Sequence, residues 1–103
     1  MEQIFPAELE ELLSEGKELT VVDVREADEV AQGKIPSAVH IPLGLLEFRL
    51  HELDKNNHYV IVCRSGGRSA RATQLLESYG YQVKNLNGGM AAWEGKTEKF
   101  LKM

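Results

Sequence analysis

The one cysteine of the sequence, Cys63, stands where two segments of different composition meet. The apolar run Val60-Ile61-Val62 precedes it, and a glycine-rich turn with two cations, Arg64-Ser65-Gly66-Gly67-Arg68-Ser69, follows it. A thiolate is a strong nucleophile, and neighbouring cationic side chains favour it over the thiol. Adjacent glycines let successive backbone N–H groups converge on an anion. These residue types at this spacing predict a nucleophilic cysteine in an anion-binding loop.

Two elements must position this loop. The β-branched residues before Cys63 are typical of a buried strand over residues 58–62, and the alanine- and leucine-rich stretch after Gly67 is typical of a helix that ends at Gly80. The apolar face of that helix is expected to hold Ala72, Leu75, Leu76 and Tyr79. A cysteine after a buried strand is usually a small core residue. Its place at a strand-to-helix turn, beside arginines and a helix N-terminus, instead favours catalysis.

The rest of the chain alternates between expected strands and helices. We expect strands over residues 4–5, 19–24, 38–41 and 81–86. We expect helices from Pro6 to Gly16, over residues 26–32, along a leucine seam over residues 43–53, and from Met90 to Trp93. Residues 94–103, with Phe100 and Leu101, are expected to form a short amphipathic cap. This alternation predicts an α/β domain with a mostly parallel sheet between helices on both faces.

Length and composition limit the class of protein. With 103 residues the chain fits a single domain over residues 1–103. Its 16 acidic and 12 basic side chains give a net charge of −4, which argues against general binding to nucleic acid or to an anionic membrane. No apolar run is long enough to span a bilayer, and the N-terminus does not read as a secretory signal, so we expect a cytoplasmic protein.

The cysteine and histidine counts narrow the chemistry further. One cysteine excludes an internal disulfide and a CxxC redox pair, so the thiol acts alone. The histidines, at positions 40, 51 and 58, do not stand at metal-ligand spacing, and we expect no metal site.

Three segments carry a family resemblance. Cys63-Arg64-Ser65-Gly66-Gly67-Arg68-Ser69 resembles the active-site loop of a single-domain rhodanese, a thiosulfate sulfurtransferase. Asp23-Val24-Arg25-Glu26, with residues 33–42, is similar to the early signature of that family, and residues 88–93 are similar to its late one. The sequence departs from the family at Lys34, where histidine is usual, and at Ser37, where glycine is usual.

The resemblance implies a fold and a reaction. The family sheet has five strands. In the implied double displacement, the Cys63 thiolate attacks the outer sulfur of thiosulfate, sulfite leaves, and the persulfide passes sulfur to a thiophilic acceptor. The acceptor would be cyanide, a small thiol, a thioredoxin-like protein or a sulfur carrier, and no cofactor is needed. Arg64 and Arg68 would neutralise the donor, and the loop N–H groups would stabilise developing charge.

Further side chains of the implied site have open roles. Ser65 and Ser69 would donate hydrogen bonds or serve as turn and N-cap residues. Asp23 is expected to fix a loop rather than act as an acid, with backbone N–H groups or Arg25 as partners. The resemblance gives Arg25 two roles, one at the site and one as a brace for the loops around it. Trp93 is expected to be a packing anchor rather than a substrate platform.

Two other functions use similar residues. A cysteine-dependent phosphatase or arsenate reductase also needs a thiolate, an arginine and a backbone nest. Four residues lie between Cys63 and Arg68, whereas the related cell-cycle phosphatases have five and therefore a wider loop. The third class is a non-enzymatic module that relays persulfide sulfur within a pathway. Turnover of free thiosulfate would argue against that module.

Overall fold

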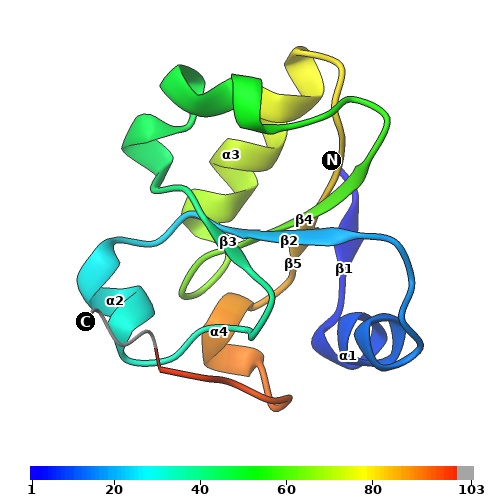
Figure 1. The fold of residues 1–103 in the computed structure, drawn as a ribbon, viewed down its shortest axis with the longest axis vertical. Coiled ribbons are helices and arrows are strands. Elements are labelled where there is room, and N and C mark those ends of the chain that lie inside the picture. Colours follow the sequence, from blue (N-terminus) through cyan, green and yellow to red (C-terminus); the bar gives the residue numbers. More distant parts are fainter. Residues whose placement is uncertain (100–103) are drawn as a thin grey trace.

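A computed structural model describes residues 1–99 of the chain. Within these residues the strands form one parallel sheet in the order β1-β5-β4-β2-β3 (Figure 1). The strands are β1 (Gln3–Ile4), β2 (Thr20–Asp23), β3 (Val39–His40), β4 (His58–Val62) and β5 (Gln82–Leu86). The α-helices are α1 (Pro6–Ser14), α2 (Ala27–Ala31), α3 (Gly67–Ser78) and α4 (Gly89–Ala92). Two 3-10 helices, η1 (Leu43–Leu45) and η2 (Glu47–Glu52), connect β3 to β4.

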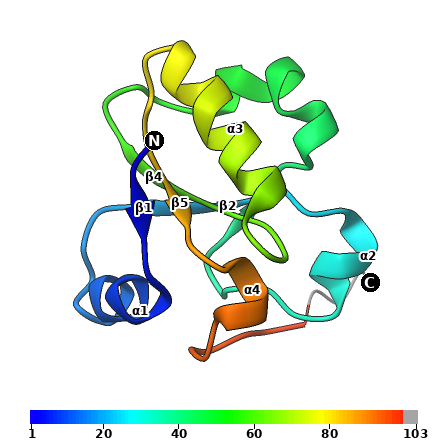
Figure 2. The ribbon, with the colours of Figure 1, turned by 180° about the vertical axis from the view of Figure 1, so that it is seen from behind.

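The helices form a layer on each side of the sheet. Helix α3 and the two 3-10 helices lie on one side, and α1, α2 and α4 lie on the other (Figures 1 and 2). Each face of the sheet is covered by its own apolar cluster, one including Ile61 and Leu76, the other including Val60 and Leu9. The expected α/β architecture, with a parallel sheet between helices, is confirmed.

Alternation along β4 decides which way Cys63 points. Tyr59, Ile61 and Cys63 belong to the cluster on the α3 side, whereas Val60 and Val62 belong to the cluster on the α1 side. Successive side chains of a strand point to opposite faces, so a residue two positions beyond Ile61 faces α3 as well. The alternation of side chains along β4 therefore places the Cys63 thiol at the beginning of α3.

Most expected elements are confirmed with small shifts at their ends. The expected strand over residues 58–62 is β4 itself, and the helix that follows it ends before Gly80, whose φ is +92°. Helix α2 ends at Ala31, with Gln32 as its C-cap directly before Gly33, and the brief strand expected near residue 39 is β3. The final strand begins at Gln82, one residue later than expected.

The expectation of one leucine-seam helix over residues 43–53 is wrong. The segment forms η1 and η2, and the backbone leaves helical geometry at Arg49, with φ −117° and ψ 17°. The leucines recur in steps of three, four and three, from Leu43 through Leu46 and Leu50 to Leu53. Steps of three match the three residues per turn of a 3-10 helix, and the step of four spans Arg49. All four leucines still reach the cluster on the α3 side.

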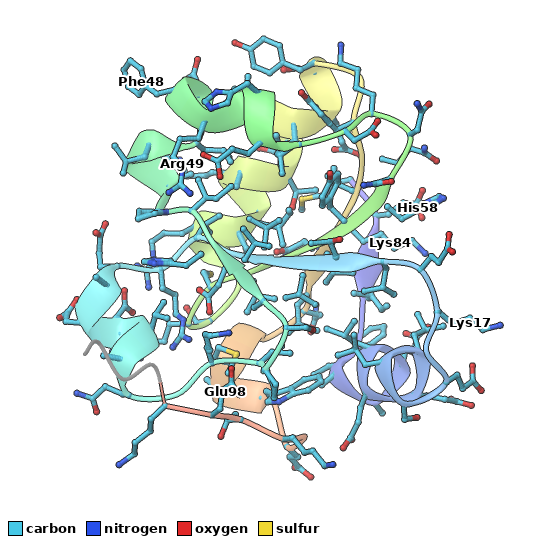
Figure 3. The ribbon with its side chains drawn as sticks, viewed as in Figure 1. Lys17, Phe48, Arg49, His58, Lys84 and Glu98 are labelled. Carbon is cyan, nitrogen blue, oxygen red and sulfur yellow. The ribbon has the colours of Figure 1, made fainter. Side chains whose placement is uncertain are left out.

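The structure also departs from what was expected of Tyr79 and of the C-terminal residues. Tyr79 does not lie on the buried face of α3, because 43% of it is exposed and its hydroxyl contacts Glu47 Oε2 at 3.3 Å. Of the cap expected over residues 94–103, residues 94–99 form no helix, and Glu98, labelled in Figure 3, makes an antiparallel bridge with Lys34. Phe100 and Leu101 lie outside the described residues. Within residues 1–99, no helix has the length and apolar composition needed to cross a membrane.

Candidate active site

The Cys63 sulfur lies under the turn that joins β4 to α3. Residues 63–69 are called the Cys63 loop below. The backbone N–H of Gly66 donates a hydrogen bond to Sγ at 3.0 Å, and the Ser69 hydroxyl contacts Sγ at 3.2 Å. Gly66 adopts φ +106°, a conformation that favours glycine, and it caps α3. Ser69 therefore does not cap the helix, since its fully buried side chain faces the sulfur.

Helix α4 fixes the other side of the loop. The N–H of Met90 donates to the Cys63 carbonyl at 2.8 Å, and the N–H of Ala91 donates to the Arg64 carbonyl at 2.8 Å. A peptide N–H points opposite to its C=O, so holding the Arg64 carbonyl at α4 turns the Ser65 N–H the other way, toward the sulfur. A Cβ on Gly89 would lie 2.5 Å from the Cys63 carbonyl oxygen, so only glycine permits this approach.

Asn85 of β5 also holds the loop. The side-chain amide of Asn85 donates to the Gly66 carbonyl at 3.4 Å and to Gln3 Oε1 at 3.0 Å. No pattern in the sequence assigned Asn85 a role at the loop. When two backbones that are far apart in the sequence approach closely, the local sequence shows this only through a glycine. The pair Gly88-Gly89 was the one sequence signal of such an approach at the loop.

The environment favours a thiolate at Cys63. Burial, the largest single effect, acts to raise the pKa of this thiol, since only 1% of the residue is exposed. The hydrogen bond from the Ser69 hydroxyl and those from the backbone of Ser69, Gly66 and Ser65 act in the opposite direction, and together they lower the pKa below its ordinary value. Hydrogen bonds to the charged form stabilise that form. The loop therefore stabilises negative charge on a sulfur withdrawn from solvent.

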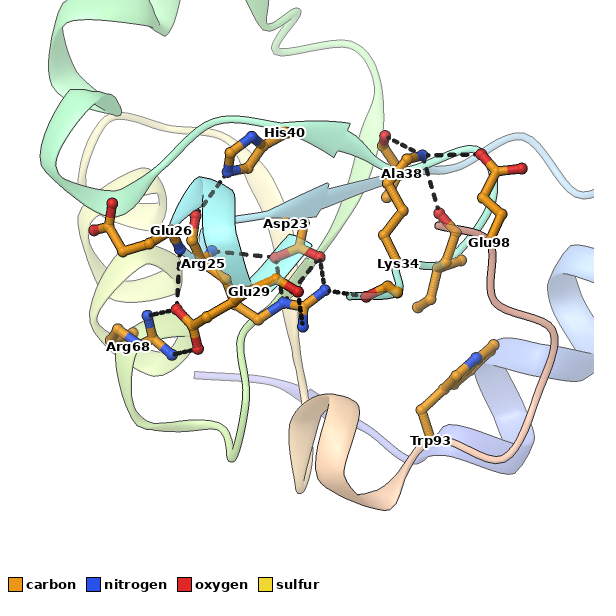
Figure 4. A network of polar contacts seen from close by, with 12 residues as sticks. Asp23, Arg25, Glu26, Glu29, Lys34, Ala38, His40, Arg68, Trp93 and Glu98 are labelled. Atoms are coloured by element: carbon orange, nitrogen blue, oxygen red, sulfur yellow. Dashed lines mark hydrogen bonds and ion pairs between the residues drawn. The ribbon is translucent and has the colours of Figure 1, made fainter. Parts of the chain in front are cut away.

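Arg68 is held by a carboxylate from a different part of the chain. Its Nη1 and Nη2 donate to Glu29 Oε1 and Oε2 at 2.6 and 2.8 Å (Figure 4). The hydrogen bond from Arg68 lowers the pKa of Glu29 to about 2. Glu29 in turn raises the pKa of Arg68, and the charges of Cys63 and Glu26 act in the same direction. Glu29 was not among the predicted site residues, because 39 residues separate it from Arg68.

Arg25 is a brace. Its guanidinium donates to both Asp23 carboxylate oxygens, with Nη2 to Oδ2 at 2.8 Å, and its backbone N–H donates to Oδ1 at 3.1 Å. Nη2 also donates to the Gly33 carbonyl at 2.7 Å, which ties the end of β2 to the end of α2. Asp23 has both of the partners expected for it and acts as a loop-fixing residue. Of the two roles left open for Arg25, the structure favours the brace.

The remaining residues of the loop differ in exposure. Arg64, Ser65 and Gly67 are exposed, while Ser69 is buried at the sulfur. Arg64 and Arg68 were expected to supply positive charge together, but the side chain of Arg68 is paired with Glu29. The side chain of Arg64 has no ion-pair or hydrogen-bond partner among residues 1–99.

Trp93 and the histidines lie outside this site. Trp93 is half-buried, packs against the cluster on the α1 side, and donates from Nε1 to the Lys96 carbonyl at 3.0 Å, which fits the expected anchor. His40 Nε2 lies 2.7 Å from the Arg25 carbonyl oxygen. In the described part of the chain, three or more His, Cys, Asp or Glu side chains nowhere gather as a metal site would require.

The fold and the loop define a class of protein: a parallel α/β domain with a single cysteine at the carboxyl end of its central strand, held beneath backbone N–H groups. Residues 5–96 match the family model described as "Rhodanese-like domain", and the chain belongs to the rhodanese-like family.

The names of individual similar proteins fit this family. A putative sulfurtransferase of Bacillus subtilis, YtwF, is 44% identical over 98 residues that cover 95% of each chain. A protein named sulfurtransferase from Allochromatium vinosum is 40% identical over 88% of this chain and 86% of its own. The crystal structure of a rhodanese-like domain protein from Staphylococcus aureus is 39% identical and superposes with a TM-score of 0.92 over 98% of this chain and all of that one.

Proposed function

We propose that this protein is a sulfurtransferase that moves a sulfane sulfur from thiosulfate or a similar donor to a thiophilic acceptor through a persulfide on Cys63. The observation that carries the proposal is the buried Cys63 sulfur, which accepts hydrogen bonds from Gly66 and Ser69 and has a lowered pKa. The names of the relatives support the class of reaction but leave the donor and the acceptor open.

The first half-reaction would use the thiolate directly. The Cys63 thiolate attacks the outer sulfur of the donor, the S–S bond of the donor breaks, and its electron pair leaves with sulfite when thiosulfate is the donor. The product is a persulfide anion on Cys63. The N–H groups of Ser65, Gly66 and Ser69, which already face Sγ, are placed to stabilise charge on the added sulfur.

The second half-reaction needs an external acceptor. Because Cys63 is the only cysteine, no second thiol of the same chain can resolve the persulfide. A small thiol, cyanide, or the cysteine of a thioredoxin-like protein or of a sulfur carrier would attack the terminal sulfur and regenerate the thiolate. This half-reaction also distinguishes catalysis from a relay module, which would not turn over free thiosulfate.

Sulfite release tests this function. Without an acceptor, thiosulfate should release one equivalent of sulfite per protein and then stop, and cyanide should restart release with formation of thiocyanate. The Cys63→Ser variant should release none, because a neutral hydroxyl is a poor nucleophile. Continuous release without acceptor, or turnover by Cys63→Ser, would contradict the proposal.

Aryl phosphates test the competing phosphatase reaction. The loop places four residues between Cys63 and Arg68, and both terminal nitrogens of that arginine are held by Glu29. A phosphatase needs its arginine on the phosphoryl oxygens and an acid for the leaving group. We therefore expect no hydrolysis of aryl phosphates. Hydrolysis faster than thiosulfate consumption would favour the phosphatase instead.

A further inference from the structure

The Arg68–Glu29 pair changes the charge that a sulfur donor meets at the Cys63 loop. The side chains of Arg68 and Glu29 are 34% and 25% exposed, so the pair is partly open to solvent rather than buried in the core. Both terminal nitrogens of Arg68 are occupied, in the bidentate geometry that guanidinium and carboxylate prefer. The two bonds use two of the five N–H donors of the guanidinium, but the Glu29 carboxylate compensates its charge, so the pair offers an arriving anion little net positive charge.

Glu29 is fixed by contacts other than Arg68. Its Oε1 accepts the backbone N–H of Glu26 at 3.0 Å, which fastens the carboxylate to the first turn of α2. The Glu29 carbonyl accepts from Arg25 Nη1 at 3.4 Å, and Arg25 is itself clamped to Asp23. Because α2 is tied to the end of β2 in this way, the carboxylate stays in place, and Arg68 is drawn to it.

The charges around the loop follow from these pairs. Asp23 neutralises Arg25, and Glu29 neutralises Arg68, so Arg64 is the cation of the loop that has no acidic partner among residues 1–99. Glu26 is exposed and close enough to Arg68 to stabilise its charge, which adds negative charge at the same place. A donor with two negative charges therefore gains less from this site than the arginines of the sequence suggest.

We propose that Glu29 is a specificity-determining residue that, by holding Arg68, selects sulfane donors of low charge, of the hydropersulfide class, over dianionic thiosulfate. The proposal rests on the proposed function. In the reaction with a hydropersulfide RSSH, the Cys63 thiolate attacks the outer sulfur, the S–S bond breaks, and RS⁻ leaves with the electron pair. The outer sulfur and its proton stay on Cys63 as the persulfide, so charge and atoms balance.

Donor competition in the Glu29→Gln variant tests the proposal. Glutamine keeps an oxygen for the Glu26 N–H but removes the charge, which frees Arg68 for an anion. Relative to the hydropersulfide of 2-mercaptoethanol, the kcat/KM for thiosulfate should rise about three- to tenfold, and the rise should shrink at high salt. The matched control is Glu52→Gln, which breaks an equally short bidentate pair with Arg49 on η2. Its donor ratio should not change.

Alkylation gives a readout that does not depend on sulfur transfer. Iodoacetate and iodoacetamide alkylate the same thiolate but differ by one negative charge, so the ratio of their rates at Cys63 reports the local potential. Glu29→Gln should raise the iodoacetate to iodoacetamide ratio, Arg68→Gln should lower it, and the double variant should return it toward the wild-type value.

The outcomes separate the two proposals. If neither donor modifies Cys63, the proposed function fails whatever the alkylation ratio does. If sulfur transfer occurs but Glu29→Gln leaves the donor ratio and the alkylation ratio unchanged, or shifts either toward the less charged reagent, the specificity role of Glu29 is wrong.

Discussion

Two arginine–carboxylate pairs flank the Cys63 loop, and they differ mainly in burial. The Arg25–Asp23 pair spans two residues, closes at 2.8 Å, and leaves 7% and 1% of its side chains exposed. The Arg68–Glu29 pair spans 39 residues, closes at 2.6 Å, and leaves 34% and 25% exposed. In both pairs the guanidinium donates hydrogen bonds to both carboxylate oxygens, so the two pairs have nearly the same interaction geometry.

Burial gives these similar pairs different consequences. A buried ion whose partner is removed stays desolvated and unpaired, which costs far more than the loss of an exposed pair. Arg25 therefore holds the ends of β2 and α2 together, and the fold depends on it. Releasing Arg68 from Glu29 costs little free energy of folding, but its positive charge then becomes available to an anion that approaches Cys63. The Arg25–Asp23 pair therefore stabilises the fold, whereas the Arg68–Glu29 pair sets the charge near Cys63.

The largest expected effect tests the stability side of this comparison. Asp23→Asn leaves the Arg25 guanidinium buried without a countercharge, and we expect the free energy of unfolding to fall by about 3–5 kcal/mol. Glu29→Gln should cost less than about 1 kcal/mol. Urea unfolding of both variants measures this difference. Equal losses in the two variants would show that burial does not separate the pairs.

An acid titration of stability examines the Arg68–Glu29 pair alone. The pKa of Glu29 is about 2 in the folded protein, below its ordinary value of 4.5. The stability from this group is therefore fully present above pH 4.5 and is lost as the pH falls toward 2. Because solvent screens the pair, we expect the wild type to lose only about 1 kcal/mol more than Glu29→Gln across this range. Parallel curves for the two proteins would contradict this assignment.

The smallest expected effect concerns the unpaired cation. Arg64 is exposed, so replacing it with glutamine should lower the kcat/KM for thiosulfate by less than about threefold, and salt should abolish the difference. Arg71→Gln, at an exposed position on α3, is the matched control and should have no effect. A loss of a hundredfold in Arg64→Gln would mean that Arg64 contacts the donor directly.

The parts predicted from the sequence are those set by local pattern. The β-branched run before Cys63 and the glycines after it were enough to place the thiol at the turn from β4 to α3, because strand period and helix start are local properties. The leucine seam over residues 43–53 had the composition of a helix, but steps of three and four do not alone distinguish a 3-10 helix from an α-helix.

The parts that were missed depend on contacts between distant segments. Glu29 follows the N-terminus of α2, where an acidic residue is already explained by the helix start, so nothing local linked it to Arg68. The hydrogen bonds from Met90 and Ala91 to the loop carbonyls join segments more than 25 residues apart. The net charge of the site is the sum of such contacts, which explains why Arg64 and Arg68 suggested a more cationic loop than the structure contains.

The mass of Cys63 after exposure to a donor shows whether this cysteine carries the transferred sulfur. Incubation with thiosulfate, or with a hydropersulfide, should leave the intact protein one sulfur atom heavier, with the added mass mapped to the peptide that contains Cys63 and removed by cyanide. Cys63→Ser should gain no mass under the same conditions. A protein that stays unmodified with both donors, or that carries the added sulfur at another residue, would show that Cys63 does not form the persulfide.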